Sequence, residues 1–140
     1  LDGAMLCNQE AGRRMLAGRS GAIVNIASIA GRFGHPRRLP YSVGKAAIGA
    51  LTRTLAVEWA QGGVRVNAVA PGYVDTPMVR EGERLGLFSR EQAAEMHAMK
   101  RLAAPSELAD PIVYLLSSAA SFITGETLYA DGGFSVLKAS

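Results

Sequence analysis

Cysteine is almost absent from this chain, since Cys7 is the only one among 140 residues. A disulfide framework within the chain is therefore excluded, which fits a reducing compartment. We expect Cys7 to be a small apolar residue of the core. The sequence also lacks a signal peptide and any apolar run long enough to span a membrane. These absences predict a cytoplasmic protein without a membrane partner.

The chain also carries no large excess of charge of one sign. Lys and Arg together number 15 and Asp and Glu 12, which leaves a net charge of +3. Arg32, Arg37 and Arg38 come nearest to a basic cluster, but no aromatic residues alternate with them as in a nucleic-acid surface. We predict no nucleic-acid partner, and we expect these arginines to be solvated rather than to bind an anionic substrate or cofactor tail. Neither His35 nor His97 has a Cys, Asp or Glu at metal-ligand spacing, so no metal site is predicted.

Hydrophobic residues, in contrast, make up 49% of the chain, enough for one domain over residues 1–140 with its own core. Periodicity and turn signals predict helices and strands in alternation. They are a helix at 1–16, a strand at 22–27, a helix at 41–61, a strand at 64–70, a helix at about 105–118 and a strand at 127–130. This alternation is typical of an α/β fold in which crossover helices connect parallel strands.

The segment 75–100 is polar and irregular with helical patches, as expected for a mobile flap. Its larger apolar side chains either line a substrate pocket or cover a core, and the sequence leaves both alternatives open. They are Met78, Val79, Leu85, Leu87, Phe88, Met96 and Met99. Two further polar residues, Asn25 and Asn67, lie inside apolar strands, where we expect them to make structural hydrogen bonds.

A hydroxyl, a phenol and an amine follow the first strand at a notable spacing. Ser28 is separated by twelve residues from Tyr41, and Lys45 comes four positions after Tyr41. Residues four apart lie on one face of a helix, and Pro40 suits the first turn of that helix. A lysine ammonium beside a phenol favours the phenolate, as does the helix N-terminus. Such a phenol can exchange a proton with a carbonyl or alcohol oxygen, and Ser28 could hold that oxygen.

Strand ends provide a second group of candidate residues. Ser28 follows the strand 22–27, and Pro71-Gly72 follows the strand 64–70. Ligands of open α/β sheets bind beyond the carboxyl ends of the strands. Because Gly72 has no side chain, a flat ring could approach its backbone closely.

Four motifs in this order and spacing resemble the short-chain dehydrogenase/reductase family. They are G-A-I-V-N-I-A-S at 21–28, Y-S-V-G-K-A-A at 41–47, V-R-V-N-A-V-A-P-G-Y-V-D-T-P at 64–77 and F-I-T-G-E-T-L-Y-A-D-G-G-F at 122–134. The resemblance implies the C-terminal part of a doubly wound, Rossmann-like parallel sheet. It also implies an oxidoreductase that moves a hydride between NAD or NADP and a carbonyl or secondary alcohol. A homotetramer or dimer packed through the long helices is implied as well.

The resemblance assigns roles to individual residues. It implies that Tyr41 is the catalytic acid/base, that Ser28 orients the substrate oxygen and that Lys45 assists Tyr41 and bonds the nicotinamide ribose. Cofactor contacts are implied for Tyr41, Lys45, Pro71, Gly72, Val74 and Thr76. Among these, Val74 would bond the nicotinamide carboxamide through its backbone, and Thr76 would add a side-chain contact.

The chain departs from the family in its N-terminal features. No G-x-G-x-x-G phosphate loop occurs, and the family's catalytic helix asparagine would fall before Leu1, so Asn8 is not assigned that role. We therefore expect a piece of a longer protein that is unstable or aggregates alone, because its sheet edge at 22–27 would be open. The alternative to an enzyme is a truncated, non-catalytic module that packs on a full-length relative.

Overall fold

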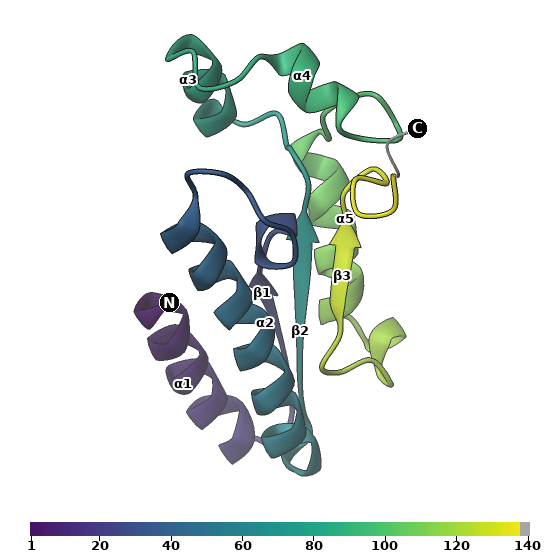
Figure 1. The fold of residues 1–140 in the computed structure, drawn as a ribbon. Coiled ribbons are helices and arrows are strands. Elements are labelled where there is room, and N and C mark those ends of the chain that lie inside the picture. Colours follow the sequence, from purple (N-terminus) through teal and green to yellow (C-terminus); the bar gives the residue numbers. More distant parts are fainter. Residues whose placement is uncertain (138–140) are drawn as a thin grey trace.

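Strand β2 (Val64–Pro71) is the central strand of a three-stranded parallel sheet in the computed structural model, which describes residues 1–137. It pairs on one side with β1 (Gly21–Ile26) and on the other with β3 (Thr127–Ala130). Its residues are almost fully buried because helices cover both faces (Figure 1), which explains its nearly continuous apolar sequence.

Two helices cover one face of the sheet, α1 (Asp2–Ala17) and α2 (Leu39–Trp59), and α5 (Pro105–Leu116) covers the other. Successive side chains of β2 point to opposite faces of the sheet and therefore pack against different helices. Ala68 packs with Ile48 of α2, whereas Val69 packs with Leu108 and Leu115 of α5. The predicted α/β order is confirmed, and the helices begin and end within about two residues of the expected positions.

Buried amides connect these layers. Asn25 of β1 exchanges hydrogen bonds with Asn8 of α1 (2.8 and 3.3 Å) and donates to Thr52 Oγ1 of α2 (3.1 Å). Asn67 of β2 donates to the Ile123 carbonyl (2.9 Å) and accepts from the Glu126 amide (3.0 Å). The predicted structural role of both strand asparagines is confirmed.

The expectation for Cys7 is wrong, because this residue is exposed. Helix α1 turns Asn8 and Gly12 toward the protein, and Gly12 lies against the Trp59 ring. Since successive helical residues are about 100° apart, Cys7 falls on the outward side.

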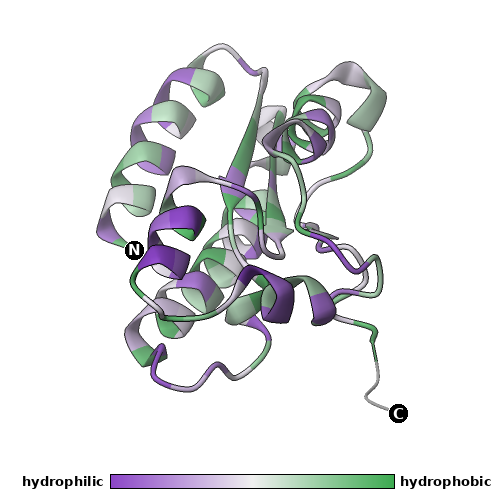
Figure 2. Cartoon of the chain, turned by 90° about the horizontal axis from the view of Figure 1, so that it is seen from above, coloured by the Kyte–Doolittle hydropathy of each residue, from purple (hydrophilic) through white to green (hydrophobic). Residues whose placement is uncertain are grey.

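Figure 2 shows bands of both hydrophilic and hydrophobic residues along the helices, as expected for helices with one covered face.

The predicted flap contains two short helices beyond the carboxyl ends of the strands, α3 (Pro77–Arg84) and α4 (Arg90–Glu95) (Figure 1). Each starts with a hydroxyl cap. Thr76 Oγ1 accepts the Val79 amide hydrogen at 3.3 Å, and Ser89 Oγ accepts that of Gln92 at 3.0 Å. These caps explain why helices form in a segment whose apolar pattern is weak.

Candidate active site

Ser28 lies two residues after the end of β1 and caps a short 3₁₀ turn, Ile29–Gly31. Its Oγ accepts the Ala30 amide hydrogen at 3.2 Å, which leaves the hydroxyl hydrogen free to donate. Gly31 then passes against α2 so closely that a Cβ on it would lie 2.8 Å from the Lys45 carbonyl carbon. The absence of a side chain at Gly31 therefore allows the Ser28 turn to rest on the first turns of α2.

Lys45 connects the end of β1 with Tyr41. Its Nζ donates a hydrogen bond to the Ile26 carbonyl at 2.7 Å and lies 5.8 Å from the centre of the Tyr41 ring. Tyr41 is 47% exposed, so its side chain is open to a ligand. Two of the three ammonium hydrogens of Lys45 remain for other partners. The three residues predicted from their spacing thus lie around the carboxyl end of β1.

The backbone at Val74 has an unusual bonding pattern. Val74 forms one isolated parallel bridge with Ala103, in which the Ala103 amide donates to the Tyr73 carbonyl (3.0 Å) and the Asp75 amide to the Ala103 carbonyl (2.9 Å). In such a bridge the central residue's own N–H and C=O point away from the partner. Within residues 1–137 these two groups of Val74 make no hydrogen bond. They are therefore available to a ligand.

Charged groups hold the segment that follows Val74. Asp75 accepts hydrogen bonds from Arg90 (2.7 and 3.1 Å) and from Arg80 (2.8 Å). The two guanidinium groups hold the pKa of the Asp75 carboxyl well below its usual range. The neighbouring Thr76 is the helix cap described above, and its hydroxyl hydrogen is not needed for the cap.

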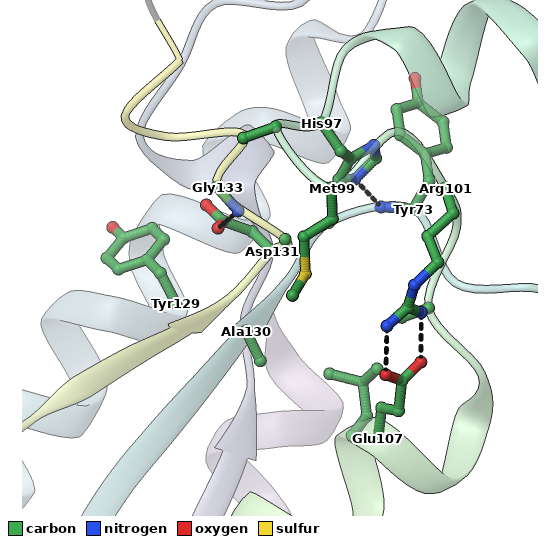
Figure 3. Close-up of a pocket in the computed structure, with 14 residues that line it drawn as sticks. Tyr73, His97, Met99, Arg101, Glu107, Tyr129, Ala130, Asp131 and Gly133 are labelled. Atoms are coloured by element: carbon green, nitrogen blue, oxygen red, sulfur yellow. Dashed lines mark hydrogen bonds and ion pairs between the residues drawn. The ribbon is translucent and has the colours of Figure 1, made fainter.

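His97 is a residue of this region that the sequence did not reveal (Figure 3). It is 2% exposed, its Nδ1 lies 2.7 Å from the Ala93 carbonyl oxygen, and its Nε2 accepts the Tyr73 amide hydrogen at 3.1 Å. A Cβ on Gly72 would lie 2.5 Å from this Nε2. The flat ring that approaches Gly72 in the structure is therefore the imidazole of His97. Its burial depends on contacts between distant segments, which leave no local sequence signal.

A hollow of about 450 Å³ lies between the ends of β2 and β3, the start of α5 and the flap (Figure 3). Its charged side chains are already paired. Both Glu107 oxygens accept from Arg101 at 2.7 Å, and both Asp131 oxygens accept backbone amide hydrogens at 2.9 Å. Hydrogen bonds from Arg101 and from the Ala104 amide lower the pKa of Glu107 to about 2. Within the described residues this hollow thus offers mainly apolar and backbone surface.

Most of the apolar flap side chains neither line the hollow nor cover a core. Five of the seven are exposed, and Met99 is the one that lines the hollow. Phe88 is half-buried and packs against the Tyr73 ring with centroids 5.5 Å apart. The arginines near the active-site loop are exposed as predicted, and Arg32 lies over the Tyr129 ring at 5.2 Å.

Residues 1–137 contain neither a cluster of metal-binding side chains nor a membrane-spanning helix. No group of three or more His, Cys, Asp or Glu side chains lies close enough together there to hold a metal ion. No helix in the same range combines the length and the apolar character needed to cross a membrane.

Comparison with known proteins places the chain in a family. A family model described as enoyl-(acyl carrier protein) reductase matches residues 1–135. The chain belongs to the short-chain dehydrogenase/reductase family. The α/β fold predicted from the motifs, part of a doubly wound Rossmann-like sheet, is thereby confirmed.

Several relatives in this family are dehydrogenases. Over 98% of its length the chain is 46% identical to cis-4-hydroxycyclohexanecarboxylate dehydrogenase of Sinomonas cyclohexanicum, of which it covers 54%. It resembles the structure of gluconate 5-dehydrogenase from Burkholderia cenocepacia J2315 in complex with NADP and tartrate. There the TM-score is 0.92 and the identity 31%, over 99% of this chain and 54% of that one.

A second similar structure carries a different name. It is that of ribose-5-phosphate isomerase from Brucella melitensis 16M, with a TM-score of 0.95 and 38% identity, covering 97% of this chain and 52% of that one. The chain thus spans about half the length of the curated relatives and solved structures that it matches.

Proposed function

We propose that this chain carries the proton-transfer and nicotinamide-binding part of an oxidoreductase that uses NAD or NADP. The substrate is a carbonyl compound or a secondary alcohol. The observation that carries this proposal is the position of Lys45, which donates to the Ile26 carbonyl at the end of β1 and lies over the Tyr41 ring. This position gives Tyr41 a fixed cation at the rim where ligands of such sheets bind.

Each residue has a role that its contacts permit. Tyr41 gives its hydroxyl proton to the carbonyl oxygen during reduction and recovers a proton from the alcohol during oxidation. Ser28 donates a hydrogen bond to the same oxygen with the hydrogen that its cap leaves free. Lys45 keeps two ammonium hydrogens for the ribose hydroxyls. When bound, the nicotinamide cofactor supplies or accepts the hydride.

The backbone after β2 fits a nicotinamide. A carboxamide has one acceptor and two donor hydrogens, and Val74 offers one free N–H and one free C=O. The Thr76 hydroxyl can add a hydrogen bond, and Pro71 and Gly72 lead the chain to this position. The NADP complex of the gluconate 5-dehydrogenase that this chain resembles supports the choice of cofactor class.

A test requires a protein with a cofactor phosphate site. We define the completed protein as residues 1–140 joined behind the N-terminal half of the Sinomonas relative. In the completed protein, Tyr41→Phe should reduce turnover by about 10²–10⁴-fold, because it removes the proton donor. NADH or NADPH affinity, followed by cofactor fluorescence, should change little. Lys45→Ala should weaken both cofactor binding and turnover.

Tyr114 provides a matched control, because it is 46% exposed but lies on α5, on the other face of the sheet. Tyr114→Phe should leave turnover unchanged. Full activity of the Tyr41→Phe protein would disprove the assignment of Tyr41. Binding of the 140-residue chain to a full-length relative, without turnover in the completed protein, would favour the non-catalytic module instead.

We also propose that the protein assembles into a dimer or tetramer through α1 and α2. Large apolar side chains are exposed on both helices, including Leu6 (65%), Val43 (59%) and Val57 (81%). Small residues such as Ala46 and Ala50 are exposed beside them, which permits close approach of a second helix pair. Light scattering of the completed protein and of a Val57→Glu variant tests this assembly.

A further inference from the structure

We propose that His97 is a positioning residue for the cofactor, which rests on the function proposed above. Its neutral imidazole holds the Tyr73 amide and thereby fixes the direction of the free N–H and C=O of Val74. Within residues 1–137 the ring nitrogens of His97 bond the backbone of Tyr73 and Ala93 and not Ser28, Tyr41 or Lys45, so its effect is transmitted through the backbone.

The two hydrogen bonds of His97 determine its tautomer. The Ala93 carbonyl oxygen can only accept, so the Nδ1 that lies 2.7 Å away carries a hydrogen. The Tyr73 amide can only donate, so the Nε2 at 3.1 Å has no hydrogen. The ring is therefore neutral and protonated on Nδ1. A hydrogen on Nε2 would face the amide hydrogen and abolish this bond.

The imidazole is enclosed from several sides. The Tyr73 and Phe134 rings meet it edge-on at centroid distances of 5.9 and 5.6 Å. Gly72 and Gly132 lie beside it where side chains would collide or touch: a Cβ on Gly132, whose φ is +56°, would lie 3.5 Å from the ring. Because these contacts come from the segment after β2, the flap and the turn after β3, the ring has little freedom to move.

His97 completes a series of three fixed peptide groups. It bonds the Tyr73 amide, which belongs to the peptide group between residues 72 and 73. The next two peptide groups are held by the amide and carbonyl of Ala103, as described for the isolated bridge. Val74 lies between the second and third of these peptide groups, and its own polar groups face away from Ala103. Loss of the His97 bond frees the first peptide group, so that the bridge to Ala103 alone would hold the segment around Val74.

Two substitutions separate the two hydrogen bonds. Gln can place an oxygen acceptor near the position of Nε2, so His97→Gln keeps a partner for the Tyr73 amide. Asn carries an NH₂ near the position of Nδ1, so His97→Asn keeps the bond to the Ala93 carbonyl and loses the other. Each variant lacks one hydrogen bond, and we expect both to be destabilised by similar amounts.

The experiment measures the dissociation constants of NADH and NADPH for the completed protein and both variants, with urea unfolding of each. We expect His97→Asn to bind the cofactor roughly 10-fold more weakly, as for one lost hydrogen bond, and His97→Gln to stay within about 2-fold of the original. Equal affinities of the two variants would overturn the positioning role, since a residue that only stabilises the fold would affect both alike.

A nitrogen-15 NMR measurement on the unmodified completed protein decides the tautomer even where a variant does not fold. A pyridine-like shift for Nε2 and a pyrrole-like shift for Nδ1 support the inference, and the opposite assignment overturns it. Unmodified completed protein that binds neither NADH nor NADPH would refute the proposed function, and the inference with it. Binding without a difference between the variants would refute the inference alone.

Discussion

The buried hydrogen-bond cluster of Asn8, Asn25 and Thr52 leads to a quantitative prediction. Three hydrogen bonds end on Asn25, and Asn25→Ala removes all of them. At about 1 kcal/mol net for each bond, the variant should lose roughly 3 kcal/mol of unfolding free energy. Thr52→Val keeps the shape of a fully buried side chain and removes one bond, so it should cost about 1 kcal/mol.

Thermal and urea unfolding of the completed protein measure these differences. For a protein of 150–250 residues, 1 kcal/mol lowers the melting temperature by roughly 2–4 °C, so we expect about 6–12 °C for Asn25→Ala and about 2–4 °C for Thr52→Val. In the double variant, Thr52→Val should add nothing, because Asn25 was the partner of that hydroxyl. The reasoning is refuted if Asn25→Ala is no more destabilising than Thr52→Val.

Two other predictions concern the turn after β1 and the start of α5. Gly31→Ala would place a methyl group against the α2 backbone and should lower the unfolding free energy by about 1–3 kcal/mol, measured by urea unfolding. The control Gly34→Ala, whose added methyl group meets nothing within 4 Å, should leave the unfolding free energy almost unchanged. Equal effects of the two substitutions would contradict the close approach of Gly31 to α2. The pKa of Glu107 falls from 4.5 to about 2 on folding, so the folded state binds fewer protons and stability should decline as the pH falls through this range. Glu107→Gln should flatten that part of the stability profile, and an unchanged slope would contradict the assignment.

Local patterns were sufficient to predict the strands and long helices, for physical reasons that the structure makes clear. Strand β2 is buried on both faces, so its predominantly apolar sequence from Val64 to Ala70, interrupted by Arg65 and Asn67, was a reliable signal. Helix α2 begins two residues before Tyr41 and keeps Pro40 in its first turn, where a proline is tolerated. The four-residue spacing of Tyr41 and Lys45 therefore placed both side chains correctly on one helix face.

Contacts between distant segments could not be predicted in the same way. His97 lies in a polar segment, and its burial arises because the flap meets Gly72 and the turn after β3. Cys7 was assigned to the core from its residue type, whereas the rotation of α1 decides its exposure. The free polar groups of Val74 depend on the bridge to Ala103, whose partner in the chain no local pattern indicates.

The parallel order of the sheet also constrains how the chain can fold during synthesis. Parallel strands cannot pair through a tight hairpin, so each pairing with β2 must await a complete crossover. On the β3 side, Asn67 accepts the amide hydrogen of Glu126, which lies 59 positions later in the sequence. Such long-range closure slows folding, because chain entropy is lost before contacts compensate for it. On a ribosome, one edge of β2 therefore stays unpaired until residue 130 has emerged.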